Sequence, residues 1–124
     1  MGETVKLVFC VRRRDDVDPE EFHRYWLEEH AVLVRSVGEL LRIRRYVQSH
    51  TMRGPLTDAL TASRGAAEPY DGLAELWFDV EDLERELTEQ TLAANVLLLE
   101  DERRFIDLER SSLFLSVEHE IIGG

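Results

Sequence analysis

Six segments of regular hydrophobic spacing follow one another in the order strand, helix, strand, strand, helix, strand. The helix predicted over residues 18–37 is the most clearly marked, because Asp18 can cap it and Pro19 suits its first helical position. A second helical part is predicted over residues 79–104, with a break near Thr91. The predicted strands are residues 4–12, 41–50, 73–78 and 111–120.

This order of elements predicts an α+β fold of the ferredoxin-like βαββαβ type, with a four-stranded antiparallel sheet and helices on one face. A right-handed crossover makes the first two strands parallel and leaves room for the third strand between them. The other face of the sheet is expected to be partly apolar, which is unusual for an exposed sheet in a monomer. We assign to that face Val8, Cys10, Tyr46, Trp77 and Phe114. The sequence therefore predicts a homodimer in which two sheets pack face to face.

A long loop is predicted over residues 51–69, which contain Gly54, Pro55, Gly65 and Pro69. One short helix is expected within it, near residues 56–62. Loops of this length inside a small domain are often functional.

Composition limits the classes of function. The 124 residues suit one domain, residues 1–124, and the net charge of −11 repels nucleic acids, so no nucleic-acid partner is expected. No apolar run approaches the roughly 20 residues of a membrane-spanning helix, so no membrane association is expected. The N-terminal residues lack the pattern of a signal peptide, so a cytoplasmic location is expected. Cys10 is the single cysteine, which excludes an internal disulfide and a multi-cysteine zinc site.

Four blocks of the sequence resemble the EthD family of the dimeric α/β-barrel superfamily, and they occur in the family's order. They are residues 22–31, which are similar to the family's F..YW...HA helix, and residues 46–50, 70–78 and 101–107. The resemblance implies that two ferredoxin-like subunits form a dimeric α/β barrel. The wider superfamily includes cofactor-free monooxygenases, polyketide cyclases, muconolactone isomerases and haem-degrading enzymes, so the fold alone does not select one chemistry.

His30 is the first candidate for catalysis. It interrupts an apolar helical stripe formed by Phe22, Trp26, Leu33 and Val37, so its ring is expected to face the sheet. An imidazole in that position can transfer protons near neutral pH. The alternative is a buried histidine whose hydrogen bonds tie the helix to the sheet.

Two further groups of polar residues are candidates. Tyr46, Gln48 and His50 share one face of the second strand and could hold a substrate oxygen, or could simply face water or a partner subunit. Asp71 could act as a general base, or could bond neighbouring amides in the turn before the third strand. Among these residues, His30, Tyr46 and Asp71 are the predicted catalytic set.

The aromatic residues predict an apolar wall for a flat or apolar ligand. Alternatively, these residues belong only to the hydrophobic core. The predicted substrate-binding residues are Phe22, Trp26, Leu33, Gln48, His50 and Trp77. On the same face as Trp77, Glu75 is expected to pair with Arg44 or Lys6. No ligand spacing indicates a metal site, and no nucleotide-binding motif is present, so neither metal nor cofactor is expected.

These features support three hypotheses. The first is a cofactor-independent enzyme, of the oxidoreductase or monooxygenase, dehydratase or cyclase type, that acts on a small apolar or aromatic compound in catabolism or polyketide-like metabolism. Its pocket would lie between the first helix and the sheet, with His30 as the proton shuttle. The second is a non-catalytic binding protein that assists an oxygenase or a degradation pathway. The third is a structural dimer without a cavity.

Overall fold

The structure, a computed structural model, describes residues 3–124 and contains one four-stranded sheet in the order β2-β3-β1-β4. Every neighbouring pair of strands is antiparallel, and β3 lies between β1 and β2 as predicted. The strands are β1 Thr4–Val11, β2 Arg45–His50, β3 Gly72–Asp79 and β4 Ser112–Ser116. The α+β, ferredoxin-like architecture is therefore confirmed.

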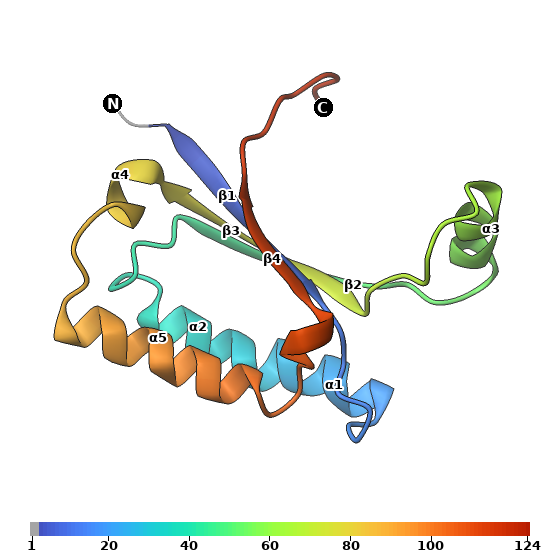
Figure 1. Ribbon diagram of the computed structural model, residues 1–124, viewed down its shortest axis with the longest axis horizontal. Coiled ribbons are helices and arrows are strands. Elements are labelled where there is room, and N and C mark those ends of the chain that lie inside the picture. The colour runs from blue at the N-terminus through green and yellow to red at the C-terminus, as the bar shows by residue number, and fades with distance from the viewer. Residues whose placement is uncertain (1–2) are drawn as a thin grey trace.

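The helices that cover the sheet lie on one face of it (Figure 1). α1, η1 and α2 form one continuous rod, α5 runs beside it, and α3 projects away from the rest of the molecule (Figure 1). Their bounds are α1 Pro19–Tyr25, η1 Trp26–His30, α2 Ala31–Val37, α3 Pro55–Ser63, α4 Val80–Leu83, α5 Glu89–Glu102 and η2 Leu108–Arg110. The short helix expected in the long loop is thus present as α3.

Three boundaries differ from the prediction. β2 begins at Arg45 rather than at residue 41, because residues 39–42 form a turn in which Arg42 has a φ of 59°. β4 ends at Ser116, because its neighbour β1 pairs with it no further than Lys6. The second helical part is divided into α4 and α5 as predicted, but the break lies at residues 84–88 rather than near Thr91, because α5 starts at a capping box made by Thr88 and Thr91.

The pairing register assigns each strand residue to one face of the sheet. Tyr46 lies opposite Leu76 on the face that the helices cover, so its predicted place on the open face is wrong. On β2, Arg45, Val47 and Ser49 face the open side instead. Because side chains alternate along a strand, an error of one residue in phase exchanges the two faces.

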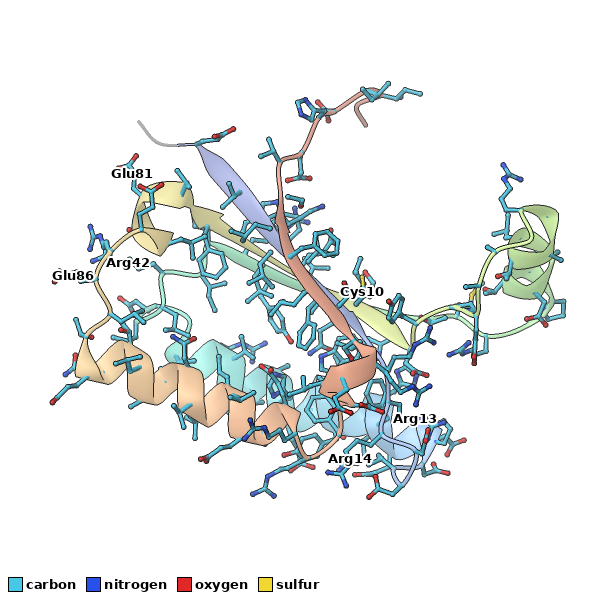
Figure 2. The ribbon with its side chains drawn as sticks, in the orientation of Figure 1. Cys10, Arg13, Arg14, Arg42, Glu81 and Glu86 are labelled. Atoms are coloured by element: carbon cyan, nitrogen blue, oxygen red, sulfur yellow. The ribbon has the colours of Figure 1, made fainter. Side chains whose placement is uncertain are left out.

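The open face has charge at its centre as well as apolar groups. Lys6 Nζ lies 2.7 Å from Glu75 Oε2, which is one of the two pairings expected for Glu75. The Trp77 ring is flanked by Lys6 and by the guanidinium of Arg45, which lies 4.6 Å from the ring centroid. Cys10 also belongs to this face, opposite Leu73 (Figure 2).

The hydrophobic core lies between the sheet and the rod of α1, η1 and α2. Its buried residues are Val11, Phe22, Trp26, Ala74, Phe105 and Ile106. Gly72 makes room for Trp26, since a Cβ atom at Gly72 would lie within 2.6 Å of the indole carbon Cη2. Among residues 3–124, no helix combines the length and apolar character that crossing a membrane requires.

Candidate functional site

The first helical rod places four side chains against the sheet. Phe22, Trp26, His30 and Val34 recur at steps of four, and all four are buried. In an α-helix with 3.6 residues per turn, each such step overshoots a full turn by about 40°. The π-helical turn η1 holds more residues in one turn and so keeps these side chains on one side. Leu33, the residue predicted for this stripe, is only half-buried and is replaced there by Val34.

The π-helical turn also leaves a carbonyl group available to the sheet. The Trp26 oxygen accepts a hydrogen bond from the amide of Ala31, and Gln48 Nε2 donates a second one to it over 2.9 Å. This contact fixes the side chain of Gln48 under the helix. π-Helical turns occur often at functional sites, where they place a group that a regular helix could not.

A small cavity of about 50 Å³ lies beneath this turn. We call it the His30 cavity. It is lined by Phe9, Trp26, His30, Val34, Tyr46, Ala74, Leu76, Leu98, Glu102 and Ile106. Its walls are therefore mostly apolar, with three groups that can exchange protons: an imidazole, a phenol and a carboxyl.

His30 is held by a carboxylate from the second helical layer. The residue is 4% exposed, and its Nδ1 lies 2.7 Å from Asp101 Oδ2 on α5. The Tyr25 hydroxyl donates to the other oxygen of Asp101 over 2.5 Å. Because a carboxylate accepts both bonds, the proton of a neutral His30 is on Nδ1 and the lone pair is on Nε2.

The second ring nitrogen of His30 is available to the cavity. Nε2 has no hydrogen-bond partner among residues 3–124, and part of its surface is accessible. Burial lowers the pKa of His30 below its ordinary value, although the hydrogen bond to Asp101 raises it in part. The ring is therefore neutral at pH 7, with an accepting nitrogen beside the cavity.

The pKa of Glu102 shifts in the opposite direction. Burial, aided by the charge of the neighbouring Asp101, raises the pKa of the Glu102 carboxyl to about 7. Burial also raises the pKa of the Tyr46 phenol, so it stays protonated. The cavity thus combines a base whose pKa is lowered with an acid whose pKa is raised, the arrangement that acid–base catalysis needs.

A chain of hydrogen bonds orients the polar residues of β2. Gln48 Nε2 donates to the Tyr46 hydroxyl over 2.8 Å, so the phenol proton is left for another acceptor. His50 Nε2 donates to Gln48 Oε1 over 2.8 Å, and its Nδ1 lies 2.7 Å from Nδ1 of His23. The ring of His50 also packs against Trp26 in a tilted arrangement, with 4.4 Å between centroids. Gln48 and His50 therefore support Tyr46 and Trp26 from outside the cavity lining.

Four further predicted residues do not line this cavity: Phe22, Leu33, Asp71 and Trp77. Phe22 lies in the core beside Trp26. Asp71 accepts a hydrogen bond from the amide of Arg13 over 2.8 Å and pairs with Arg53 at 3.0 Å, so it holds the loops at the start of β3. Arg13 lies at the α1 end of the molecule (Figure 2). Trp77 lies on the open face of the sheet and does not join Trp26 in one wall, because the two are separated by the sheet.

Asp101 and Glu102 were not among the residues predicted for the site. Asp101 is 71 positions from His30, so no local spacing joins them. A signal for Glu102 was present, because Ala94, Leu98 and Glu102 recur at steps of four on the inner face of α5. A carboxyl that continues an apolar stripe is a candidate for a functional site.

Metal ligands are not grouped in the part of the chain that the structure describes. Within residues 3–124, no three side chains of histidine, cysteine, aspartate or glutamate gather as a metal site would need. The groups around the His30 cavity can instead accept, donate and hold protons.

Comparisons with known proteins agree with this fold. A crystal structure of an ethyl tert-butyl ether D (EthD) family protein from Bacillus halodurans C-125 has a TM-score of 0.61 at 18% identity, covering 94% of this chain and 99% of that one. An EthD-like protein from Ralstonia eutropha JMP134 has a TM-score of 0.53 at 14% identity, with coverages of 98% and 96%. A dimeric ferredoxin-like protein of unknown function from Thermobifida fusca YX has a TM-score of 0.56 at 12% identity, with coverages of 95% and 93%.

The search of curated proteins found no match. The family model of the EthD domain matches residues 14–109, a range that includes His30, Tyr46, Asp101 and Glu102. Since this match spans most of its length, the chain belongs to the EthD family.

Proposed function

We propose that the protein is a cofactor-independent enzyme that transfers a proton on a small, mostly apolar compound with a carbonyl or phenol oxygen. The observation that carries this proposal is the buried imidazole of His30, fixed by Asp101 at 2.7 Å through Nδ1 while Nε2 remains free for the cavity. A histidine that served only as a spacer would need no free nitrogen beside a cavity.

The proposed step is the conversion of a carbonyl compound to its enol. Nε2 of His30 takes the proton from the carbon next to the carbonyl, and the electrons of that C–H bond form the C=C bond. The carbonyl oxygen then gains the negative charge, which the Tyr46 hydroxyl stabilises by a hydrogen bond and Glu102 neutralises by donating its proton. Oxidation, dehydration, cyclisation and isomerisation can each continue from such an enol or from a phenolate.

The size of the cavity limits what reacts there. About 50 Å³ accommodates a few water-sized groups, so only the reacting end of a substrate can enter it. The apolar walls, which include Phe9, Leu76 and Leu98, exclude water and strengthen the electrostatic interactions of the polar groups.

We also propose that the protein is a homodimer that packs through the open face of the sheet. Trp77, Phe114 and Leu73 supply apolar area on that face, and the similar Thermobifida protein is described as dimeric. Native mass spectrometry should give twice the chain mass of 14.4 kDa, and a monomer at micromolar concentration would contradict the proposal. The same spectrum would show any retained small ligand.

Proton exchange in D₂O tests the enzymatic proposal whatever the final product of the reaction is. Small ketones and phenols would be incubated with the wild-type protein, with His30→Gln and with His119→Gln, an exposed histidine outside the cavity. We expect enzyme-dependent deuterium incorporation by the wild type and by His119→Gln, and a loss of about 100-fold or more in His30→Gln. Equal exchange by all three proteins would remove His30 from the mechanism. Retention of a ligand without exchange of any compound would favour the binding-protein hypothesis.

A further inference from the structure

A chain of hydrogen bonds links two half-buried histidines to the wall of the His30 cavity. It runs from His23 on α1 through His50 and Gln48 to Tyr46, the last three on β2. At its outer end, His23 lines a separate hollow of about 490 Å³ near the start of α1. Neither His23 nor His50 lines the His30 cavity, so an effect of either on the reaction must pass through Gln48 and Tyr46.

The backbone carbonyl of Trp26 fixes the direction of the bonds in this chain. A carbonyl oxygen only accepts hydrogen bonds, so the atom of Gln48 that lies 2.9 Å from it is the amide nitrogen Nε2. The amide oxygen Oε1 of Gln48 therefore faces His50. An amide oxygen also only accepts, so His50 Nε2 carries a proton and donates it across 2.8 Å.

The same reasoning assigns the proton between the two histidines. Burial lowers the pKa of His23 and of His50, although the charge of Asp71 raises the pKa of His23 in part, so both rings are neutral at pH 7.5. A neutral His50 with its proton on Nε2 has a lone pair on Nδ1. The proton in the 2.7 Å contact between the two Nδ1 atoms then belongs to His23. His23 thus holds His50 in the one neutral tautomer that can donate to Gln48.

This order of donors leaves one role for the Tyr46 hydroxyl. Its oxygen accepts from Gln48 Nε2 over 2.8 Å, and no group of residues 3–124 accepts its proton. Tyr46 lines the His30 cavity, so that proton is available to an oxygen atom bound there. If Gln48 turned over, its Oε1 would take the phenol proton instead. The neutral amide does not pass protons on, so the chain orients the phenol and does not conduct protons.

We propose that His50, held in its tautomer by His23, is a positioning residue that keeps Tyr46 a hydrogen-bond donor to the substrate oxygen. This inference rests on the proposed function for the reaction that the donor assists. The oxygen becomes negative as the enolate forms, so a donor to it stabilises the transition state more than the bound ketone. Loss of the correct orientation should therefore lower kcat and leave KM almost unchanged.

Two substitutions of His50 separate its two ring nitrogens. In His50→Gln, the longer side chain places an amide N–H near the position of Nε2, so a donor to Gln48 is kept. In His50→Asn, the shorter side chain places its amide near the position of Nδ1, so that donor is lost. Both variants remove the ring that packs against Trp26, so a purely structural role predicts similar losses in the two.

The first readout does not depend on activity. At pH 7.5, ¹⁵N NMR of the imidazole nitrogens should show His50 protonated on Nε2 and His23 on Nδ1, and in His23→Phe the His50 ring should populate both tautomers. A nuclear Overhauser effect between the side-chain amide protons of Gln48 and the Tyr46 ring should be present in the wild type and in His50→Gln, and lost in His50→Asn. The opposite tautomer of His50, its persistence in His23→Phe, or an unchanged Overhauser effect in His50→Asn would overturn the inference.

The second readout is deuterium incorporation into acetophenone and 2-butanone in D₂O. We expect His50→Gln to keep close to the wild-type rate and His50→Asn to lose about 10-fold in kcat, less than the removal of an oxyanion donor costs. Equal rates in the two variants, or a loss confined to KM, would refute the positioning role. No exchange of either ketone by the wild type would count against the proposed function, and the NMR readout would still decide whether His50 positions Tyr46.

Discussion

Replacing Glu102 with glutamine should stabilise the protein at alkaline pH, although the change removes a group from the candidate site. Burial raises the pKa of this carboxyl from an ordinary 4.5 to about 7 in the folded protein. Between these two values the folded chain keeps a proton that the unfolded chain has released, so the stability of the wild type falls as pH rises through this window. At about 1.4 kcal/mol per pKa unit, ionised Glu102 costs the folded state about 3 kcal/mol by pH 8. Glutamine has the same shape and no such cost.

The assay is urea unfolding of the wild type, Glu102→Gln and Glu100→Gln at pH 4.5 and pH 8, followed by tryptophan fluorescence. Glu100 is exposed on the same helix, so it controls for the loss of one negative charge. Relative to the wild type, Glu102→Gln should gain about 3 kcal/mol of unfolding free energy between the two pH values, and Glu100→Gln should gain almost none. His30, whose pKa is lowered, destabilises the fold as pH falls below about 6.5, but it does so in all three proteins. A Glu102→Gln difference that does not change with pH would refute the account of this carboxyl.

Two other substitutions test the support of the site. In Asp101→Asn, an amide N–H faces the ring, so the proton of His30 moves to Nε2. We expect the rate of substrate proton exchange to fall by about 100-fold and the free energy of unfolding to fall by about 2 kcal/mol. Glu100→Gln should keep the exchange rate and the stability of the wild type. Unchanged exchange in Asp101→Asn would show that the carboxylate does not set the tautomer. In Gly72→Ala, the new Cβ would lie within 2.6 Å of Trp26 Cη2. We therefore expect the free energy of unfolding, measured by thermal unfolding, to fall by about 3 kcal/mol. A variant as stable as the wild type would contradict the close packing of Gly72 against Trp26.

The fold follows from sequence to a large extent, because the strands and helices differ in hydrophobic period and their order permits few topologies. The phase of β2 could not be predicted in this way. Tyr46 was expected on the open face of the sheet, but Tyr46, Gln48 and His50 face the helices instead. Their polar atoms are satisfied there by one another, by the carbonyl of Trp26 and by His23, and an alternating pattern does not show which of its two faces will find such partners.

The candidate site could likewise be predicted from the sequence only in part. A histidine in an apolar helical stripe was visible as a candidate, and the structure buries its ring beside a cavity. Its partner Asp101 comes from a helix 71 positions away, and only the packing of α5 against the first rod brings the two together. The raised pKa of Glu102 likewise depends on burial, which a single sequence shows only as a stripe position.

The protonation state of the His30 ring tests most directly whether His30 can accept a proton from a substrate, and ¹⁵N NMR of the imidazole nitrogens measures it. We predict a neutral ring at pH 7 with its proton on Nδ1, which donates it to Asp101, and an unprotonated Nε2. The His30→Gln variant assigns the signals. A ring that is cationic at pH 7, or neutral with its proton on Nε2, would contradict the proposal that this nitrogen accepts a proton from a substrate.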